Sequence, residues 1–179
     1  MVTILFESHG TILDNEAHIA SGHFDVELSK LGQVQAQEIG KRYRSISLDA
    51  IFCSDLKRSY ETAKIAFEEQ NIPIVIDSRL RECDYGDWTR RPSTEVEKEK
   101  ENHIMEPFPN GESYTQTADR MKLCLEDLRN QYENKTVLII GHRATQYGLE
   151  HWIHKVPLEQ VVTAPWKWQP SRTYQLSSL

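Results

Sequence analysis

The stretch VTILFESHGTILDN, residues 2–15, decides how the rest of the chain is interpreted. Residues 2–6 form a short apolar run with β-branched side chains, which predicts a buried strand that ends at Ser8-His9-Gly10. His9 then lies at the carboxyl end of a strand, the edge of an open α/β sheet where ligands bind. The glycine that follows permits a sharp turn or a close approach of the backbone to a ligand. A histidine that ends a strand by chance is the alternative, since histidine also occurs in ordinary turns.

A second strand is predicted to end in the same way. Residues 136–140, TVLII, are the most continuous apolar run with β-branched residues in the sequence. The run stops at Gly141-His142, and a helix-like segment follows. Two buried strands that are far apart in the sequence therefore each end in a histidine beside a glycine.

Length and composition restrict the class of protein. A chain of 179 residues has room for one α/β domain with a full core, and no shift in composition predicts a second domain. No apolar run approaches the length needed to span a bilayer, and no leader peptide is recognisable, so we expect a cytoplasmic protein without membrane contact. Cys53, Cys83 and Cys124 are odd in number and lack CxxC spacing, which argues against a disulfide framework and fits a reducing compartment.

The charge pattern argues against nucleic acid and against a resident metal. The net charge is −6, with acidic residues concentrated in residues 95–106, so a basic face for nucleic acid is not expected. An anionic substrate would need a local basic pocket instead. Seven histidines are present, but there is no HExxH motif or Cys/His cluster, and His151 and His154 lack a suitably spaced carboxylate or cysteine. We expect neither a metal nor another cofactor.

The predicted elements alternate between strands and helices. Further strands are expected at residues 50–53, 72–76 and 172–176, and helices at 29–44, 54–67, 113–133 and 144–154. Ser54 or Asp55 is expected to cap the second helix, and Gly32, Ala36 and Gly40 form a small-residue ridge that would pack closely on the sheet. Residues 89–110 are the least regular and predict a mobile cap with one helix. The alternation predicts a single three-layer α/β/α domain over residues 1–179, with a mostly parallel central sheet.

Two polar residues are candidate ligands for an anion, and a third, Glu82, is a charged residue whose role is open; each has an ordinary alternative. Arg58 lies in the first turn of a predicted helix, where a cation opposes the helix dipole and a bound anion would account for it; the alternative is a solvated surface charge. Asn15 could donate its amide to a phosphate without adding charge, or form an Asx turn. Glu82, which lies among arginines in a loop, would by itself be interpreted as solvated charge.

Five ordered blocks of sequence resemble a known family. They are SHG at residues 8–10, SDLKRSYETA at 54–63, LRECDYGDW at 80–88, GES at 111–113 and GH at 141–142. In this order they resemble the histidine phosphatase superfamily, also called the phosphoglycerate-mutase-like family, from residue 5 to about residue 149. The order carries the specificity, because a lone HG or GH means little. The resemblance implies the same α/β/α fold, with both histidines at one edge of the sheet.

The resemblance also implies a reaction and the residues that carry it. A metal-independent phosphatase of this kind hydrolyses a small phosphorylated metabolite through phosphohistidine: His9 would attack phosphorus, and Glu82 would protonate the leaving oxygen and then activate water. Arg58 and His142 would contact the phosphoryl oxygens. The expected supporting phosphate contacts come from the following residues: Asn15, Ser21 and Arg81.

Two positions depart from the family pattern. The usual signature is Arg-His-Gly-Glu-Thr, and Ser8 stands where its arginine is expected, a loss that could cost about 3 kcal/mol of transition-state stabilisation. Arg143, directly after the second histidine, is predicted to bind phosphate in its place; the alternative is a side chain that points to solvent. Arg90 replaces the glycine expected shortly after Trp88, which leaves the local backbone path open.

Three functions are compatible with these residues. A phosphomonoester phosphatase is preferred; a phosphoglycerate-type mutase is second, because a short chain with a modest cap offers little enclosure. A catalytically attenuated protein that binds a phosphorylated ligand is third. Substrate choice would depend on residues 89–110. Trp152, Trp166 and Trp168 are interpreted as core or as an interface, which would allow a homodimer.

Overall fold

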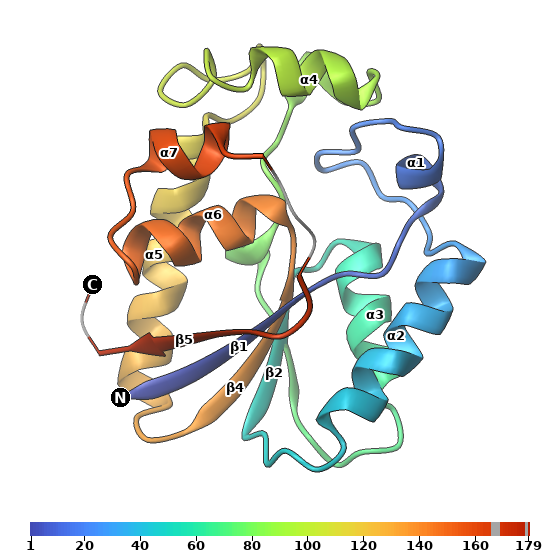
Figure 1. Cartoon of the computed structure of the whole chain (residues 1–179), viewed down its shortest axis with the longest axis vertical. Coiled ribbons are helices and arrows are strands. Elements are labelled where there is room, and N and C mark those ends of the chain that lie inside the picture. Colours follow the sequence, from blue (N-terminus) through green and yellow to red (C-terminus); the bar gives the residue numbers. More distant parts are fainter. Residues whose placement is uncertain (166–168, 178) are drawn as a thin grey trace.

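The central sheet confirms the expected α/β architecture. The computed structural model describes residues 1–165, 169–177 and 179 (Figure 1). In this part of the chain the strands are β1 (Val2–Ser8), β2 (Ala50–Cys53), β3 (Ile74–Ile76), β4 (Thr136–Gly141) and β5 (Arg172–Leu176). Their order is β3-β2-β4-β1-β5, in which only β5 is antiparallel to its neighbour. The sheet is therefore mostly parallel, as predicted.

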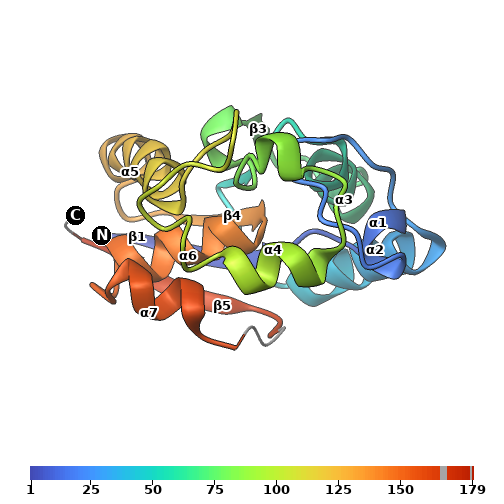
Figure 2. The ribbon, with the colours of Figure 1, turned by 90° about the horizontal axis from the view of Figure 1, so that it is seen from above.

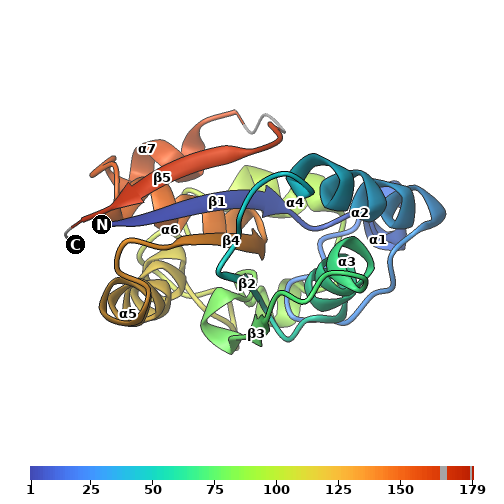
Figure 3. The same cartoon turned by 90° about the horizontal axis from the view of Figure 1, so that it is seen from below.

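Helices cover both faces of this sheet. The helices are α1 (Leu13–Glu16), α2 (Lys30–Tyr43), α3 (Lys57–Phe67), α4 (Ser93–Glu99), α5 (Tyr114–Gln131), α6 (Arg143–Trp152) and α7 (Leu158–Thr163), with 3₁₀ turns at Ser78–Leu80 and Gly86–Trp88. Figure 3 shows α5 and α6 on one side of the sheet and α2 and α3 on the other. Alternate side chains of β1 explain this arrangement, because Ile4 and Phe6 pack towards α5 whereas Leu5 packs towards α2 and α3.

The register of the two longest parallel strands places the two histidines together. Ser8 of β1 pairs with Gly141 of β4, so the next residue of each strand is a histidine at the same edge. The His9 backbone N–H donates to the Gly141 carbonyl at 3.0 Å, which extends the pairing to the histidine itself. Figure 2 shows α4 and its flanking loops above this edge.

Some local expectations are wrong. The helix after β2 has Leu56 at its N-cap without a side-chain cap: the Asp55 carboxylate pairs with Arg81, and the Ser54 hydroxyl lies against His142 and the Leu56 N–H. The two glycines of the small-residue ridge pack against segments other than the sheet. A Cβ on Gly32 would lie 2.0 Å from the Thr11 carbonyl oxygen, and one on Gly40 would lie 2.2 Å from that of Ala66. The ridge therefore holds α2 against α3 and against the loop that follows His9.

The three tryptophans near the C-terminus were expected to lie in the core or at an interface. Trp152 packs partly buried against the core and donates its indole N–H to the Ala118 carbonyl at 2.8 Å. Trp166 and Trp168 lie outside the described residues.

The helices α1 and α7 were not predicted. Within the residues that the structure covers, no helix is both long and apolar enough to cross a membrane.

Candidate active site

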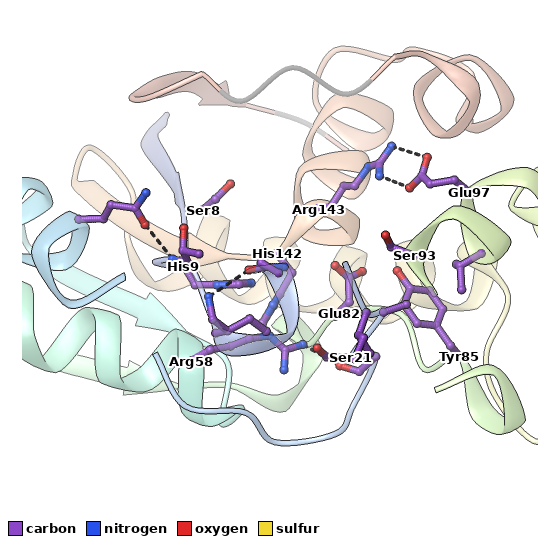
Figure 4. Close-up of a pocket in the computed structure, with 18 residues that line it drawn as sticks. Ser8, His9, Ser21, Arg58, Glu82, Tyr85, Ser93, Glu97, His142 and Arg143 are labelled. Atoms are coloured by element: carbon purple, nitrogen blue, oxygen red, sulfur yellow. Dashed lines mark hydrogen bonds and ion pairs between the residues drawn. The ribbon is translucent and has the colours of Figure 1, made fainter. Parts of the chain in front are cut away.

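A cavity of about 520 Å³ opens at the carboxyl ends of β1 and β4 (Figure 4). Its walls come from the loop after β1, the first turns of α3 and α6, the turn around Glu82, and α4. Seven of the eight predicted site residues line it: His9, Asn15, Ser21, Arg58, Glu82, His142 and Arg143. The fold thus brings together residues that are up to 134 positions apart (143 minus 9).

His9 is held as a neutral ring with one nitrogen available. Its Nδ1 lies 2.7 Å from the Gly10 carbonyl oxygen, and because a carbonyl can only accept, Nδ1 carries the proton and donates. Nε2 then keeps its lone pair. Burial, together with the nearby charge of Arg58, lowers the pKa of His9 from its ordinary value of 6.5 to about 3. The ring is therefore unprotonated at neutral pH, as a nucleophile must be.

His142 is the second ring of the site, 5.1 Å from that of His9 between centroids. Its Nε2 lies 2.7 Å from the Ser54 hydroxyl, which also accepts the Leu56 backbone N–H at 3.3 Å. Ser54 can therefore donate its proton to Nε2, which leaves the proton of His142 on Nδ1. That nitrogen is buried and has no hydrogen-bond partner among the described residues. Burial first, then Arg58, holds the pKa of His142 well below its ordinary value.

Arg58 supplies a buried positive charge. Its side chain is 2% exposed, and its two terminal nitrogens donate to the carbonyls of Phe24 at 3.1 Å and Gly22 at 2.6 Å. Burial lowers the pKa of Arg58 from its ordinary value. Within the described part of the chain no carboxylate forms an ion pair with it. A buried guanidinium bonded only to neutral carbonyls favours an anionic ligand.

Glu82 is oriented by the start of α6 and by its own turn. Its Oε1 accepts the backbone N–H groups of Cys83 at 2.8 Å and Ala144 at 3.2 Å. Its backbone carbonyl accepts from His23 Nε2 and from Arg120 Nη2, each at 2.7 Å. Both the carboxylate and the main chain of this residue are therefore fixed.

Arg120 is a positioning residue that the sequence did not reveal. Besides Glu82 it donates to the carbonyls of Arg79 at 2.7 Å and Arg81 at 3.0 Å, and it forms a two-pronged ion pair with Glu112. One side chain thus holds three carbonyls of the turn that presents Glu82. Nothing distinguishes this arginine from other charged residues on an amphipathic helix, so no sequence signal could have identified it.

Two residues with side-chain amides line the cavity. Asn15 Oδ1 accepts the Ile12 backbone N–H at 3.1 Å, and Gln35 Oε1 accepts that of Thr11 at 2.8 Å. Because each oxygen is engaged by a donor, each NH₂ group is left to donate. Gln35 also lines the cavity and was not predicted.

Three residues that were expected to contact phosphate interact with other side chains instead. Ser21 donates its hydroxyl proton to Asp14 at 2.9 Å, so it offers no donor in this arrangement. Arg81 is not among the residues that line the cavity, because its guanidinium forms two bonds to Asp55, at 2.6 and 2.5 Å.

Arg143 is the third such residue. It lines the cavity, but its guanidinium pairs with Glu97 of α4 and points away from His9 (Figure 4). It therefore does not replace the arginine that is missing at Ser8. Arg143 is the first residue of α6, and this position places its side chain next to α4.

Arg90 adopts a backbone conformation that favours glycine. Its φ is +71°, in the left-handed region, where a non-glycine residue costs about 1 kcal/mol or more. Its guanidinium forms contacts of 2.8 and 3.0 Å with the buried carboxylate of Asp14 and lies 4.7 Å from the ring centroid of Phe24. These contacts offset the strain and join the segment after Trp88 to the loop after β1.

The donor set does not resemble a metal site. Among the described residues, no three histidine, cysteine, aspartate or glutamate side chains are grouped closely enough to hold a metal ion. The cavity instead combines a neutral histidine that can attack, a buried cation, a histidine N–H without an acceptor in the described part of the chain, and an oriented carboxylate. This combination is suited to phosphoryl transfer, which requires an in-line nucleophile, donors around the phosphoryl oxygens and an acid for the leaving group.

Comparisons with known proteins agree with this chemistry. The chain is 34% identical over 149 residues to the uncharacterized phosphatase PhoE of Bacillus subtilis (strain 168), covering 83% of this chain and 76% of PhoE. It is 30% identical to a probable phosphoglycerate mutase GpmB of Erwinia tasmaniensis, covering 79% and 70% of the two chains. The solved structure of YhfR from Bacillus stearothermophilus superimposes with a TM-score of 0.81 at 27% identity, covering 94% and 87%. The sequence model of the histidine phosphatase superfamily (branch 1) matches residues 4–171, and the chain belongs to this superfamily.

Proposed function

We propose that His9, Arg58, Glu82 and His142 carry out the phosphatase reaction of this superfamily member on a small phosphorylated metabolite. The chain is a hydrolase of the phosphatase type, as its family and its similarity to PhoE indicate. The observation that supports these residue roles is the strand register, which sets a neutral His9 with a lone pair on Nε2 beside His142 and the buried Arg58.

The first half-reaction transfers the phosphoryl group to the protein. His9 Nε2 forms a bond to phosphorus as the bond from phosphorus to the ester oxygen breaks, and the electron pair leaves with that oxygen. Protonated Glu82 gives its proton to the departing alkoxide. Arg58 and the Nδ1–H of His142 donate to the phosphoryl oxygens, whose charge develops in the transition state.

The second half-reaction regenerates the histidine. Glu82, now a carboxylate, removes a proton from a water molecule as that water attacks phosphorus. The bond between phosphorus and Nε2 breaks, and the electron pair returns to His9. Inorganic phosphate leaves through the cavity mouth, over which residues 89–110 form a cap that we propose selects the substrate.

Trapping of the intermediate tests this assignment. The protein is mixed with an ester labelled at phosphorus, quenched in base, and digested; the expected label is acid-labile and lies on His9. His9→Asn should carry no label, whereas His154→Asn, on an exposed histidine outside the cavity, should label like the wild type. Label on another residue, or a burst of product without labelled protein, would remove His9 from the role of nucleophile.

Ser8 favours a second candidate function. No described basic side chain replaces the absent arginine beside His9, since Arg143 pairs with Glu97. The protein would then be a slow enzyme that binds a phosphorylated ligand more effectively than it hydrolyses it. Equilibrium binding of inorganic phosphate together with hydrolysis of an aryl phosphate separates the two functions, because a sensor binds the anion without turnover.

A further inference from the structure

One short loop holds the guanidinium of Arg58. Its two terminal nitrogens donate to the carbonyls of Gly22 at 2.6 Å and Phe24 at 3.1 Å. Both carbonyls belong to residues 21–24, which we call the carbonyl loop and which lie between α1 and α2. The direction in which the buried guanidinium points therefore depends on how firmly this loop is held.

Two contacts of the Arg90 side chain hold the carbonyl loop. Arg90 Nη1 lies 2.8 and 3.0 Å from the carboxylate oxygens of the buried Asp14, whose Oδ2 also accepts the Ser21 hydroxyl at 2.9 Å. A buried carboxylate requires such a cation to stay ionised in place. The Arg90 guanidinium also lies 4.7 Å from the ring centroid of the half-exposed Phe24, within range of a cation–π interaction. Arg90 thus reaches the first residue of the loop through Asp14 and the last one directly.

The backbone of Arg90 supports the residue that precedes the carbonyl loop. Its N–H donates to the Ala20 carbonyl at 2.8 Å, and the Ala20 N–H donates to the Arg91 carbonyl at 2.9 Å. The φ of Arg90 is +71°, a conformation that glycine adopts more readily. A glycine could therefore make the same backbone pairing with less strain. The contacts that the arginine adds are those to Asp14 and Phe24.

Other residues also tie down this part of the chain. His23 Nε2 donates to the Glu82 carbonyl at 2.7 Å, and the Asp25 carboxylate accepts the Lys57 backbone N–H at 2.9 Å. Neither contact involves the Ser21 hydroxyl or the ring of Phe24. We therefore expect the loss of the Arg90 side chain to loosen the carbonyl loop without unfolding it.

We propose that Arg90 is a positioning residue for Arg58: it fixes the loop whose carbonyls orient the buried guanidinium towards the phosphoryl group. This inference rests on the proposed function, in which Arg58 donates to the phosphoryl oxygens. It extends that function to a residue that is not among those lining the cavity. Arg90 then acts on the phosphoryl group through Arg58 and without contact to the substrate.

Equilibrium binding of inorganic phosphate tests this role without turnover. Arg90→Gly should weaken phosphate binding by about fivefold, a size typical of a residue that acts on a ligand only through other residues. Arg91→Gln is the matched control, because it removes the same charge from the next residue, whose side chain is also 45% exposed and pairs with Glu95. It should bind phosphate like the wild type. Wild-type affinity in Arg90→Gly, or an equal loss in both variants, would overturn the proposal.

A double-mutant cycle tests whether Arg90 acts through Arg58. In an Arg58→Ala background, Arg90→Gly should leave the dissociation constant of phosphate unchanged, because the carbonyl loop then has no guanidinium to orient. The same fivefold loss in this background would show that Arg90 acts on phosphate independently of Arg58, and the proposal would be wrong.

Proton exchange at the Arg58 guanidinium, measured by nuclear magnetic resonance, gives a readout that needs neither phosphate nor Arg58→Ala to bind it. Exchange should be faster in Arg90→Gly than in the wild type and unchanged in Arg91→Gln, because a looser loop opens the hydrogen bonds to Gly22 and Phe24 more often. If Arg90 only stabilised the fold, the unfolding midpoint of Arg90→Gly would fall while exchange in the folded state stayed at the wild-type rate. That result would contradict the proposal.

The same measurements separate this proposal from the proposed function. If His9 carries no phosphoryl label but Arg58 exchanges faster in Arg90→Gly, the function is wrong and the support of Arg58 by Arg90 stands. If His9 is labelled and exchange at Arg58 does not respond to Arg90→Gly, the function stands and Arg90 is not a positioning residue.

Discussion

The floor of the cavity and its roof are built in different ways. The floor consists of strand ends, where the pairing of Ser8 with Gly141 sets His9 beside His142 and backbone carbonyls hold Arg58. The roof is α4, which contacts the start of α6 through the charged pair of Arg143 and Glu97. Arg58 and His142 of the floor are buried, whereas Arg143 and Glu97 of the roof are partly exposed and pair with each other. On this basis we propose that the floor performs the chemistry and the roof selects the substrate.

Replacement of the nucleophile tests the floor most directly. His9→Ala should lower kcat/KM for any phosphomonoester by about 10⁴-fold or more, since no other described group in the cavity can form the intermediate. The unfolding midpoint should stay close to that of the wild type, because the ring ends a strand and contributes little to the core. Activity retained in a correctly folded variant would mean that the floor does not carry the nucleophile.

Replacement of Glu82 tests the proposed general acid independently of the other residues of the floor. Glu82→Gln should reduce turnover of an alkyl phosphate by roughly 10²-fold or more and turnover of an activated aryl phosphate by less, because proton donation matters most for a basic leaving oxygen. The measurement is kcat/KM for both esters. Equal losses on the two esters would assign Glu82 a structural role.

The arginine that is missing at Ser8 provides a test that involves both the floor and the roof of the cavity. Ser8→Arg should tighten phosphate or vanadate binding by about tenfold, as one added charge-assisted contact does. Since Arg143 points to Glu97 and away from His9, the effects of Ser8→Arg and Arg143→Gln should add within about 0.5 kcal/mol in a double-mutant cycle. A coupling energy well above that value would show that the two positions serve the same anion.

Arg120 tests whether the floor depends on a residue that contacts no substrate. Arg120→Met should lower kcat several-fold on an alkyl phosphate and less on an aryl phosphate, because the turn that presents Glu82 loses three hydrogen bonds to carbonyls. Arg129→Met, on the same helix, is the matched control and should show no such dependence on the leaving group. A uniform loss on both esters would indicate destabilisation only.

The neutral His9 of the floor predicts a pH-dependent stability. His9 has a pKa of about 3 in the folded protein and an ordinary value of 6.5 when unfolded, so below pH 6.5 the unfolded chain binds more protons. Stability should fall as the pH drops from about 6.5 towards 3, with a slope of up to about 1.4 kcal/mol per pH unit from this residue. Chemical denaturation at pH 7 and pH 5 measures the slope, and His9→Ala should reduce it. An unchanged slope in that variant would show that the ring is not held neutral by the fold.

The sequence by itself determined the elements and their order. Apolar residues that recur with a period of two or of 3.6 predicted the five strands and the longer helices. They do so because the spacing of apolar residues within each segment shows which of its faces is buried. The histidines at the ends of two apolar strands, and the ordered family blocks, were sufficient to predict the floor. The left-handed conformation of Arg90 was left open by the sequence, and only the structure determined it.

Only the tertiary structure decided which partner each polar side chain takes. Arg143 pairs with a carboxylate 46 positions away, Arg81 with one 26 positions away, and the Ser54 hydroxyl with a histidine 88 positions away. Sequence patterns identify the arginines but not these partners, because the distance between two side chains depends on how the helices and loops are arranged around the sheet. A local pattern records which face of an element is buried, and it contains no information on which charge of another element lies opposite.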